Sequence, residues 1–95
     1  MIWSKTLTWI VEFDDAARKE LRKLDRQSQQ EILRYLRERI ATEEDPRRFG
    51  KPLSRELAGL WRYRIQNYRI VCNIADQKLT VLVIRFGHRK DVYGD

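Results

Sequence analysis

The sequence predicts a single α+β domain, with an N-terminal strand, a two-helix hairpin, and a mainly antiparallel sheet completed by a three-stranded C-terminal meander. Three observations lead to this fold class. Apolar residues alternate near the N-terminus, recur at helical spacing over the next 30 or so residues, and alternate again between residues 60 and 86. A chain of 95 residues is long enough for one modest hydrophobic core, so we expect residues 1–95 to form one domain.

The composition is that of a folded protein, with 42% hydrophobic and 36% charged residues and no low-complexity tract. No apolar run approaches the roughly 20 residues needed to cross a bilayer. The first residues lack the basic and apolar regions of a signal peptide. The single cysteine, Cys72, has no partner in the chain for a disulfide, which fits a reducing compartment. We therefore expect a cytoplasmic protein with no membrane partner.

A strand with one apolar face is predicted at the N-terminus, because large apolar residues alternate there with other residues. Those apolar residues are Leu7, Trp9, Val11 and Phe13. Asp14 or Asp15 then offers a short carboxylate that can cap the first helix. The first helix has its apolar residues at helical spacing: Ala17, Leu21 and Leu24.

A second helix is predicted to begin at Ser28, because Ser28 followed three residues later by Glu31 is the signature of a capping box. The helix is expected to end near Thr42. Its apolar stripe consists of Ile32, Leu33, Leu36 and Ile40. The two helices therefore share an apolar side that a sheet must cover.

The segment 43–58 is predicted to be a loop, since Pro46, Gly50 and Pro52 interrupt it. Its apolar residues are expected to hold it to the core: Phe49, Leu53 and Leu57. Its basic residues either extend a basic groove or are simply solvated, with the second reading slightly favoured: Arg47, Arg48 and Lys51. Loops of this length are often functional.

Three strands are predicted at residues 60–66, 68–74 and 78–86. A two-residue turn at Gln66 and Asn67, with Asn67 in the left-handed conformation, places Arg64 directly opposite Arg69. The same turn sets Ile65 against Tyr68, Tyr63 against Ile70, and Trp61 against Cys72. A second turn at Asp76 and Gln77 sets Cys72 beside Val81 and Ile70 beside Val83.

This register divides the meander into two faces. The face expected to cover the helices carries Trp61, Tyr63, Ile65, Tyr68, Ile70, Cys72, Ile74, Leu79, Val81 and Val83. The other face carries Arg62, Arg64 and Arg69, bordered by Val71, Leu82, Ile84 and Phe86. Like charges directly opposite one another destabilise a hairpin, so a sequence that keeps Arg64 opposite Arg69 is expected to use them, for example as a cradle for phosphates.

Positive charge is concentrated in the C-terminal third of the chain. Residues 60–90 contain seven Lys and Arg against a single acidic residue, Asp76. Such a segment implies a polyanionic partner, most simply nucleic acid. The alternative is a solvated basic surface that keeps the protein soluble.

Three ordered motifs resemble the RelE family of the RelE/ParE toxin superfamily: GLWRYR at 59–64, NYRIV at 67–71 and GHRKDVY at 87–93. The resemblance covers nearly the whole chain. It implies a small cytoplasmic ribonuclease of a type II toxin–antitoxin pair, which cleaves messenger RNA in the ribosome. It also implies a RelB-like antitoxin that holds the toxin inactive and through which alone the complex contacts operator DNA. The apolar border beside the arginines suggests a docking surface for a segment of that antitoxin.

The resemblance also assigns roles to residues of this chain. It makes Arg64, Arg69 and Arg89 clamps for the transition state, and Tyr93 a general base, a group that orients the hydroxyl, or a platform for a nucleobase. The substrate-binding residues are Arg62, His88 and Lys90. His88 is favoured less as an acid or base, because the chain has only one imidazole. Structural alternatives remain for Tyr93, as part of the core, and for Arg69, in an ion pair with Glu56.

The implied chemistry needs no metal. RNA can be cut when the 2′-hydroxyl attacks the adjacent phosphate, provided that a base, cationic groups and relief for the leaving oxygen are present. One histidine, one cysteine and scattered carboxylates do not resemble a ligand set, so neither a metal nor another cofactor is expected. Arginine stays protonated, which makes it a poor base but a good bidentate clamp for phosphate.

Two rival functions remain open. A ParE-like toxin has the same fold and inhibits DNA gyrase by binding, without chemistry, and fold alone does not distinguish it from a nuclease. A gyrase-binding protein has no need for Arg64, Arg69, Arg89 and Tyr93 together, which favours the nuclease. The third possibility is an inactive module that only binds nucleic acid.

Overall fold

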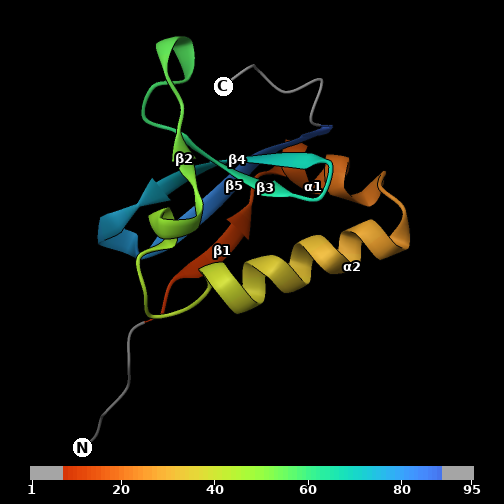
Figure 1. Cartoon of the computed structure of the whole chain (residues 1–95), viewed down its shortest axis with the longest axis horizontal. Helices are drawn as coiled ribbons and strands as arrows, with labels where there is room; N and C mark the ends of the chain where they lie inside the picture. Colours follow the sequence, from red (N-terminus) through yellow and green to blue (C-terminus); the bar gives the residue numbers. More distant parts are fainter. Residues whose placement is uncertain (1–7, 89–95) are drawn as a thin grey trace, which may run out of the picture.

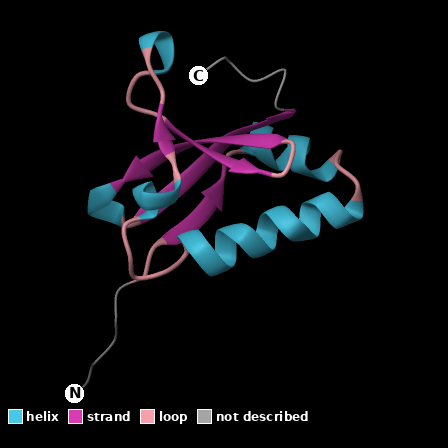
Figure 2. Cartoon of the chain, viewed as in Figure 1, coloured by secondary structure: helices cyan, strands magenta, loops and turns pink. Residues whose placement is uncertain are grey.

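The computed structural model describes residues 8–88, His88 by its backbone alone, and places two helices against one face of a five-stranded sheet (Figures 1 and 2). The helices and strands are β1 (Ile10–Phe13), α1 (Asp15–Arg22), α2 (Arg26–Tyr35), β2 (Lys51–Pro52), β3 (Trp61–Ile65), β4 (Tyr68–Ala75) and β5 (Thr80–His88). The predicted fold class is therefore confirmed. No helix between residues 8 and 88 is long and apolar enough to cross a membrane.

The strand order is β1-β5-β4-β3-β2, so the C-terminal strand lies in the interior of the sheet. β1 runs parallel to β5, with Val11 opposite Val81, and every other neighbouring pair is antiparallel. The sheet is thus mainly antiparallel, as predicted. The short edge strand β2 comes from the segment predicted as a loop, where Lys51 pairs with Arg62.

Both helix starts differ from the predictions in detail. Asp14 occupies the N-cap position of α1, but its side chain makes no capping hydrogen bond. α2 is capped by Asp25, whose carboxylate accepts hydrogen bonds from Ser28 N at 3.1 Å and Ser28 Oγ at 2.7 Å. The prediction that Ser28 caps the second helix is therefore wrong. The side chain of Asp25 is also short and can cap a helix as well as that of Ser28 can. With Asp25 as the cap, Ser28 becomes the third residue of the helix.

The second helix continues beyond α2 as one π-helical turn, Leu36–Ile40, in which Ala41 N donates to Leu36 O at 2.8 Å. Ile32, Leu36 and Ile40 are all buried, as predicted. Leu33 is 38% exposed, contrary to prediction, because it lies one residue away from the stripe that these three residues define.

The main hydrophobic core fills the space between the helices and the sheet. It consists of Trp9, Ala17, Leu21, Ile32, Leu36, Ile40, Tyr63, Ile65, Ile70, Cys72, Val81, Val83 and Phe86. Most of the predicted core face is confirmed. Trp61 is an exception, since it is only partly buried and lies beneath the guanidinium of Arg47, with 5.7 Å between Arg47 Cζ and the ring centroid.

The register of β4 against β5 differs from the prediction. Cys72 lies opposite Val83 rather than Val81, because the connection is a 3₁₀ turn, Asp76–Lys78, followed by a left-handed Leu79. A β-bulge follows, since Val71 pairs with Arg85 and leaves Ile84 as the extra residue.

The bulge changes the face on which the end of β5 presents its side chains. Phe86 lies opposite Ile70, is 5% exposed and belongs to the main core. Its predicted place on the arginine face is therefore wrong. The alternation of side chains cannot be extended through a bulge, because two residues there oppose one.

The segment between the helices and β3 packs on the opposite face of the sheet. Leu53 and Val71 form a second buried cluster, against which Leu57, Leu60 and Ile84 pack. The predicted anchoring roles of Leu53 and Leu57 are thus confirmed. Phe49 is 36% exposed, so the prediction that it pins the loop to the core is wrong.

Candidate functional site

The arginines of the β3–β4 hairpin have the predicted register. Arg64 lies directly opposite Arg69, and Arg62 lies opposite Val71. Side chains alternate along a strand, so the three arginines share the sheet face away from the helices. The connecting turn differs in one respect: Gln66, with φ of 56°, is left-handed, rather than Asn67.

The three arginines differ strongly in exposure. Arg62 is 7% exposed and Arg69 is 8% exposed, whereas Arg64 lies open to solvent. Each of them interacts with another group of the protein. The expected open cradle is therefore a pair of buried guanidinium groups with one exposed guanidinium beside them. Buried cations are held in place and act through a medium of lower dielectric constant than water.

The apolar border of this face is mostly covered. Val71 is 1% exposed and packs against Leu53, and Phe86 lies in the main core. Only Leu82 and Ile84 remain half-buried. The apolar docking surface predicted for an antitoxin segment is therefore smaller than expected, because the chain's own segment around Leu53 already covers part of it.

α1 fixes the end of β5, and sequence reasoning missed the residue that does so. One carboxylate oxygen of Glu20 accepts a hydrogen bond from Phe86 N at 2.8 Å, and the other lies 3.1 Å from Arg85 Nε. These contacts follow the bulge and precede the last described residues. Glu20 lies 65 positions before Arg85, and no local pattern distinguishes it from the other charged residues of its helix.

The end of β5 lies beside the arginine pair. Gly87 is opposite Arg69, and the backbone of His88 is opposite Tyr68. The predicted residues Arg89, Lys90 and Tyr93 lie outside the described residues, as does the side chain of His88. Their roles remain predictions.

Two basic residues of the segment 43–58, Arg47 and Arg48, are engaged in ion pairs, and Lys51 is exposed. Arg47 donates two hydrogen bonds to Asp76, at 3.0 Å and 2.5 Å, and a third to Asp45 at 3.2 Å. Arg47 thereby lowers the pKa of the Asp76 carboxyl below its usual value. Arg48 forms an ion pair with Glu44. Arg47 thus ties this segment to the turn between β4 and β5, whereas Arg48 pairs within the segment, and for these two arginines the structure differs from both sequence readings.

Two buried side chains, Cys72 and Tyr63, are excluded as nucleophiles or bases. Burial raises the pKa of the Cys72 thiol, and Cys72 is fully buried, as predicted. The Tyr63 hydroxyl donates to Pro46 O at 2.7 Å, and burial raises its pKa as well. Neither group is a nucleophile or base at neutral pH, because each remains protonated and inaccessible.

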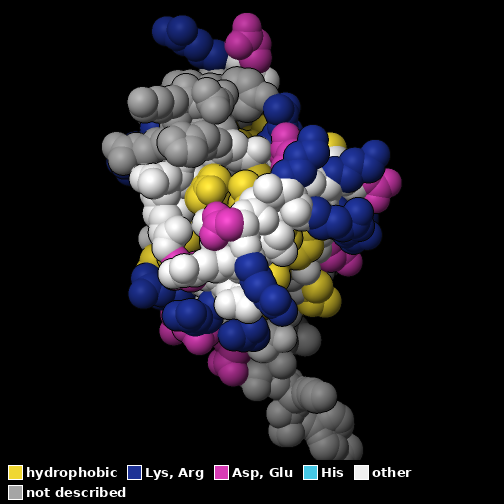
Figure 3. All heavy atoms as spheres, turned by 90° about the vertical axis from the view of Figure 1, so that its right-hand side faces the viewer, with side chains coloured by type: hydrophobic (Ala, Val, Ile, Leu, Met, Phe, Trp, Pro, Cys, Tyr) yellow, Lys and Arg dark blue, Asp and Glu magenta, His cyan; other side chains and the backbone are white. Residues whose placement is uncertain are grey.

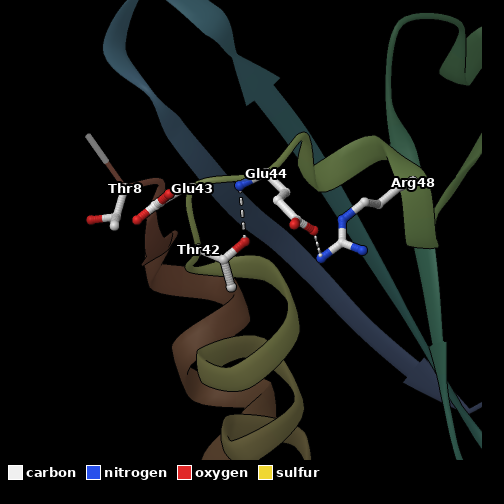
Figure 4. A pocket seen from close by; sticks show the side chains of 5 residues that line it. All are labelled: Thr8, Thr42, Glu43, Glu44 and Arg48. Atoms are coloured by element: carbon white, nitrogen blue, oxygen red, sulfur yellow. Dashed lines mark hydrogen bonds and ion pairs between the residues drawn. The ribbon is translucent and has the colours of Figure 1, made fainter. Parts of the chain in front are cut away.

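A hollow of about 410 Å³ lies where the second helix ends, close to the start of β1 (Figure 4). It is lined by Thr8, Thr42, Glu43, Glu44 and Arg48. Two polar groups of Glu44 have partners within the protein: its backbone N–H donates to Thr42 Oγ1 at 3.2 Å, and its carboxylate forms an ion pair with Arg48. None of the predicted site residues lines this hollow. It therefore does not belong to the arginine site.

Charged side chains are spread over the face shown in Figure 3, with Lys and Arg among Asp and Glu and with hydrophobic side chains between them. Positive charge is thus not confined to the strand arginines. Across residues 8–88 no three His, Cys, Asp or Glu side chains are grouped so as to hold a metal ion.

Comparisons with known proteins agree on one superfamily of toxins. A family model described as the ParE toxin of the type II toxin–antitoxin system parDE matches residues 11–93. The chain is 36% identical over 87 residues to toxin RelG of Mycobacterium tuberculosis, covering 92% of this chain and 98% of RelG.

Solved structures give the same result. The toxin–antitoxin complex RelBE2 of Mycobacterium tuberculosis contains a chain that matches with a TM-score of 0.80 and 34% identity, covering 92% of this chain and 98% of that one. The isolated RelE toxin of E. coli matches with a TM-score of 0.66 and 24% identity, covering 84% and 83% of the two chains. The second match, at this identity, concerns the fold alone.

Proposed function

Because this chain belongs to the RelE family, within the RelE/ParE superfamily of type II toxin–antitoxin toxins, we propose that it cleaves messenger RNA in the ribosome and so inhibits translation. The observation that carries the proposal is the direct opposition of Arg64 and Arg69. β3, β4 and β5 themselves contain no Asp or Glu. Two cations on adjacent strands suit a phosphate whose negative charge increases during the reaction.

The proposed reaction is a transesterification within the RNA. The 2′-oxygen forms a bond to the adjacent phosphorus, the bond from phosphorus to the 5′-oxygen breaks, and the products carry a 2′,3′-cyclic phosphate and a 5′-hydroxyl. A base removes the proton of the 2′-hydroxyl, and the leaving 5′-oxygen gains a proton. Tyr93 is the proposed base or hydroxyl-orienting group, and Arg89 is a further clamp.

The exposure of the arginines supports different tasks for them. Arg64 is exposed and is suited to direct contact with a phosphate oxygen. Arg62 and Arg69 are buried, which suits fixed charges that stabilise the transition state and position the RNA backbone. His88 and Lys90 complete the proposed substrate contacts.

A RelB-like antitoxin is the proposed protein partner. The RelBE2 structure that this chain resembles is a complex of a toxin with its antitoxin. We propose that a cognate antitoxin binds this chain and holds it inactive in the cytoplasm. Contact with operator DNA would then run through the antitoxin alone.

A ParE-like inhibitor of DNA gyrase is the second candidate, favoured by the description of the matching family model. It would need no phosphate clamp, so it leaves the paired Arg64 and Arg69 without a task. The two candidates also differ in what they damage: one breaks translated messenger RNA, and the other changes DNA topology.

Mapping of RNA ends after induced expression tests the proposal. We expect new 5′-hydroxyl ends inside coding regions while translation runs, and none when initiation is blocked beforehand. Plasmid supercoiling should stay unchanged in the same cells. Intact messenger RNA together with relaxed plasmid would overturn the nuclease in favour of the gyrase inhibitor.

A further inference from the structure

A second hollow lies at the open edge of β3, where the end of this strand faces α2. β2 pairs only with Trp61 and Arg62, so among residues 8–88 no strand pairs with the rest of β3 on that side. The hollow has a volume of about 300 Å³. The lining residues that matter here are Glu31, Arg34, Tyr35, Glu38, Arg39 and Arg64.

Two lining residues, Tyr35 and Arg39, belong to an arrangement of guanidinium groups and aromatic rings. Arg39 Cζ lies 5.3 Å from the centroid of the Tyr35 ring and 5.6 Å from that of the Phe49 ring. Arg48 lies over Phe49 at 4.3 Å, and the Tyr35 and Phe49 rings meet edge to face with centroids 6.4 Å apart. The rings hold Arg39 in place, and Phe49 remains 36% exposed.

The charges of the lining indicate the chemistry of a ligand. The lining residues include two acidic ones, Glu31 and Glu38, and three basic ones, Arg34, Arg39 and Arg64. A phosphate would be repelled by the two carboxylates. A nucleobase is uncharged, carries both donors and acceptors on its edges, and stacks on rings and guanidinium planes. It therefore suits this lining better than a phosphate does.

The position of Arg64 connects the hollow to the paired arginines. Arg64 lines the hollow and lies directly opposite Arg69. A nucleotide whose phosphate contacts Arg64 would therefore have a base, its own or its neighbour's, within reach of the hollow.

We propose that the hollow between α2 and the end of β3 is a nucleobase subsite, in which Arg39 and Tyr35 provide the stacking surface and Glu31 and Glu38 accept hydrogen bonds from the base. The inference rests on the proposed function, since the base belongs to the RNA that is cut beside Arg64. It makes α2 and the π-helical turn that follows it contributors to codon preference.

Cleavage on programmed ribosomes tests this subsite. A synthetic messenger RNA presents its A-site codon either intact or with an abasic residue at one of its three positions, and single-turnover cleavage rates are compared for the unchanged protein and Arg39→Gln. Removal of the contacted base should slow the unchanged protein about five- to a hundredfold, the range typical of one base-stacking contact. Arg39→Gln should slow cleavage of the intact codon similarly and lose further sensitivity to that base.

Arg37→Gln is the matched control, because Arg37 is exposed on the same π-helical turn and lines a different groove, with Val11 and Phe13 of β1. It should keep the full dependence on the base. Glu38→Gln is a second test that preserves side-chain size; it should change the preference among the four bases at that codon position. Melting temperatures of all variants check that each is folded.

Three outcomes would overturn the inference. Equal losses from the abasic residue in the unchanged protein and in Arg39→Gln would show that Arg39 contacts no base. Normal cleavage by Arg39→Gln with weakened antitoxin binding would make the hollow an antitoxin surface. Failure of the unchanged protein to cut any programmed messenger RNA would remove the proposed nuclease function, and the subsite with it.

Discussion

Arg64 and Arg69 face each other across β3 and β4, in an arrangement that costs the hairpin stability. Arg69 is almost completely buried, while Arg64 is exposed, so only one member of the pair can readily leave its place. A neutral residue at either position would relieve the repulsion. The pair therefore separates stability from the proposed activity, and the two can be measured independently.

Arg64→Leu should slow messenger RNA cleavage by roughly a hundredfold or more, the typical loss for one transition-state donor. It should leave the free energy of unfolding unchanged or raise it by tenths of a kcal/mol, because the repulsion from Arg69 disappears. Single-turnover cleavage and urea unfolding measure the two effects. Arg37→Leu, at an exposed position of the π-helical turn, controls for the loss of one positive charge. A marked loss of stability in Arg64→Leu would instead make this arginine structural.

Glu20→Ala should destabilise the domain by about 1–3 kcal/mol, because Phe86 N would lose its acceptor in a partly buried position. Glu20→Gln keeps a carbonyl oxygen for Phe86 N and should lose less. Cleavage should fall with Glu20→Ala even at temperatures where it is fully folded, since Glu20 holds the end of β5, which precedes Arg89. Equal stability of both variants and the unchanged protein would show that the contact is dispensable.

Gly50→Ala should destabilise the domain by about 1–3 kcal/mol through crowding. A Cβ atom at position 50 would lie 3.1 Å from Tyr63 Cε1 and 3.2 Å from Arg62 O, and Tyr63 is fully buried. The backbone of Gly50, with φ of −110°, suits alanine, so the effect is steric. Urea unfolding measures it. Gly59→Ala gives the contrasting case. Gly59 has φ of 94°, and a Cβ atom there would meet nothing within 4 Å beyond its chain neighbours, so any loss comes from backbone strain.

Because of the ion pair between Arg47 and Asp76, the free energy of unfolding should decrease as the pH falls below about 4, near the ordinary pKa of an aspartate. The folded pKa of Asp76 is lowered by the hydrogen bonds from Arg47, so the unfolded state takes up a proton first as the pH falls. The contribution is complete above the unfolded pKa and is lost as the pH falls through the folded pKa.

Asp76→Asn provides the comparison for this pH dependence. Urea unfolding between pH 7 and pH 2.5 should show a steeper loss for the unchanged protein than for Asp76→Asn. The pKa of Asp25 is also lowered, by its hydrogen bonds from Ser28, but Asp25 is present in both proteins and its effect cancels. Parallel curves for the two proteins would contradict the role of the ion pair.

Much of the candidate site follows from the sequence, but not its accessibility. The two-residue turn and the alternation of side chains fix Arg62, Arg64 and Arg69 on one face. Arg62 and Arg69 are nevertheless buried and Arg64 is exposed, and the segment around Leu53 covers the neighbouring Val71 on the same face. The role of Glu20 and the hollow beside α2 also arise from residues far apart in the chain.

The sequence by itself determined the α+β fold class, the apolar stripe of the second helix and the register of β3 against β4. Each depends on periodicity or on a turn between adjacent strands, and both are local properties. Only the tertiary structure decided that Ile84 bulges out of β5, that Phe86 turns into the core, and that β2 joins the sheet. Those features depend on contacts between distant segments, because an extra residue in a strand or a covered sheet face is stabilised by what packs against it rather than by its sequence neighbours.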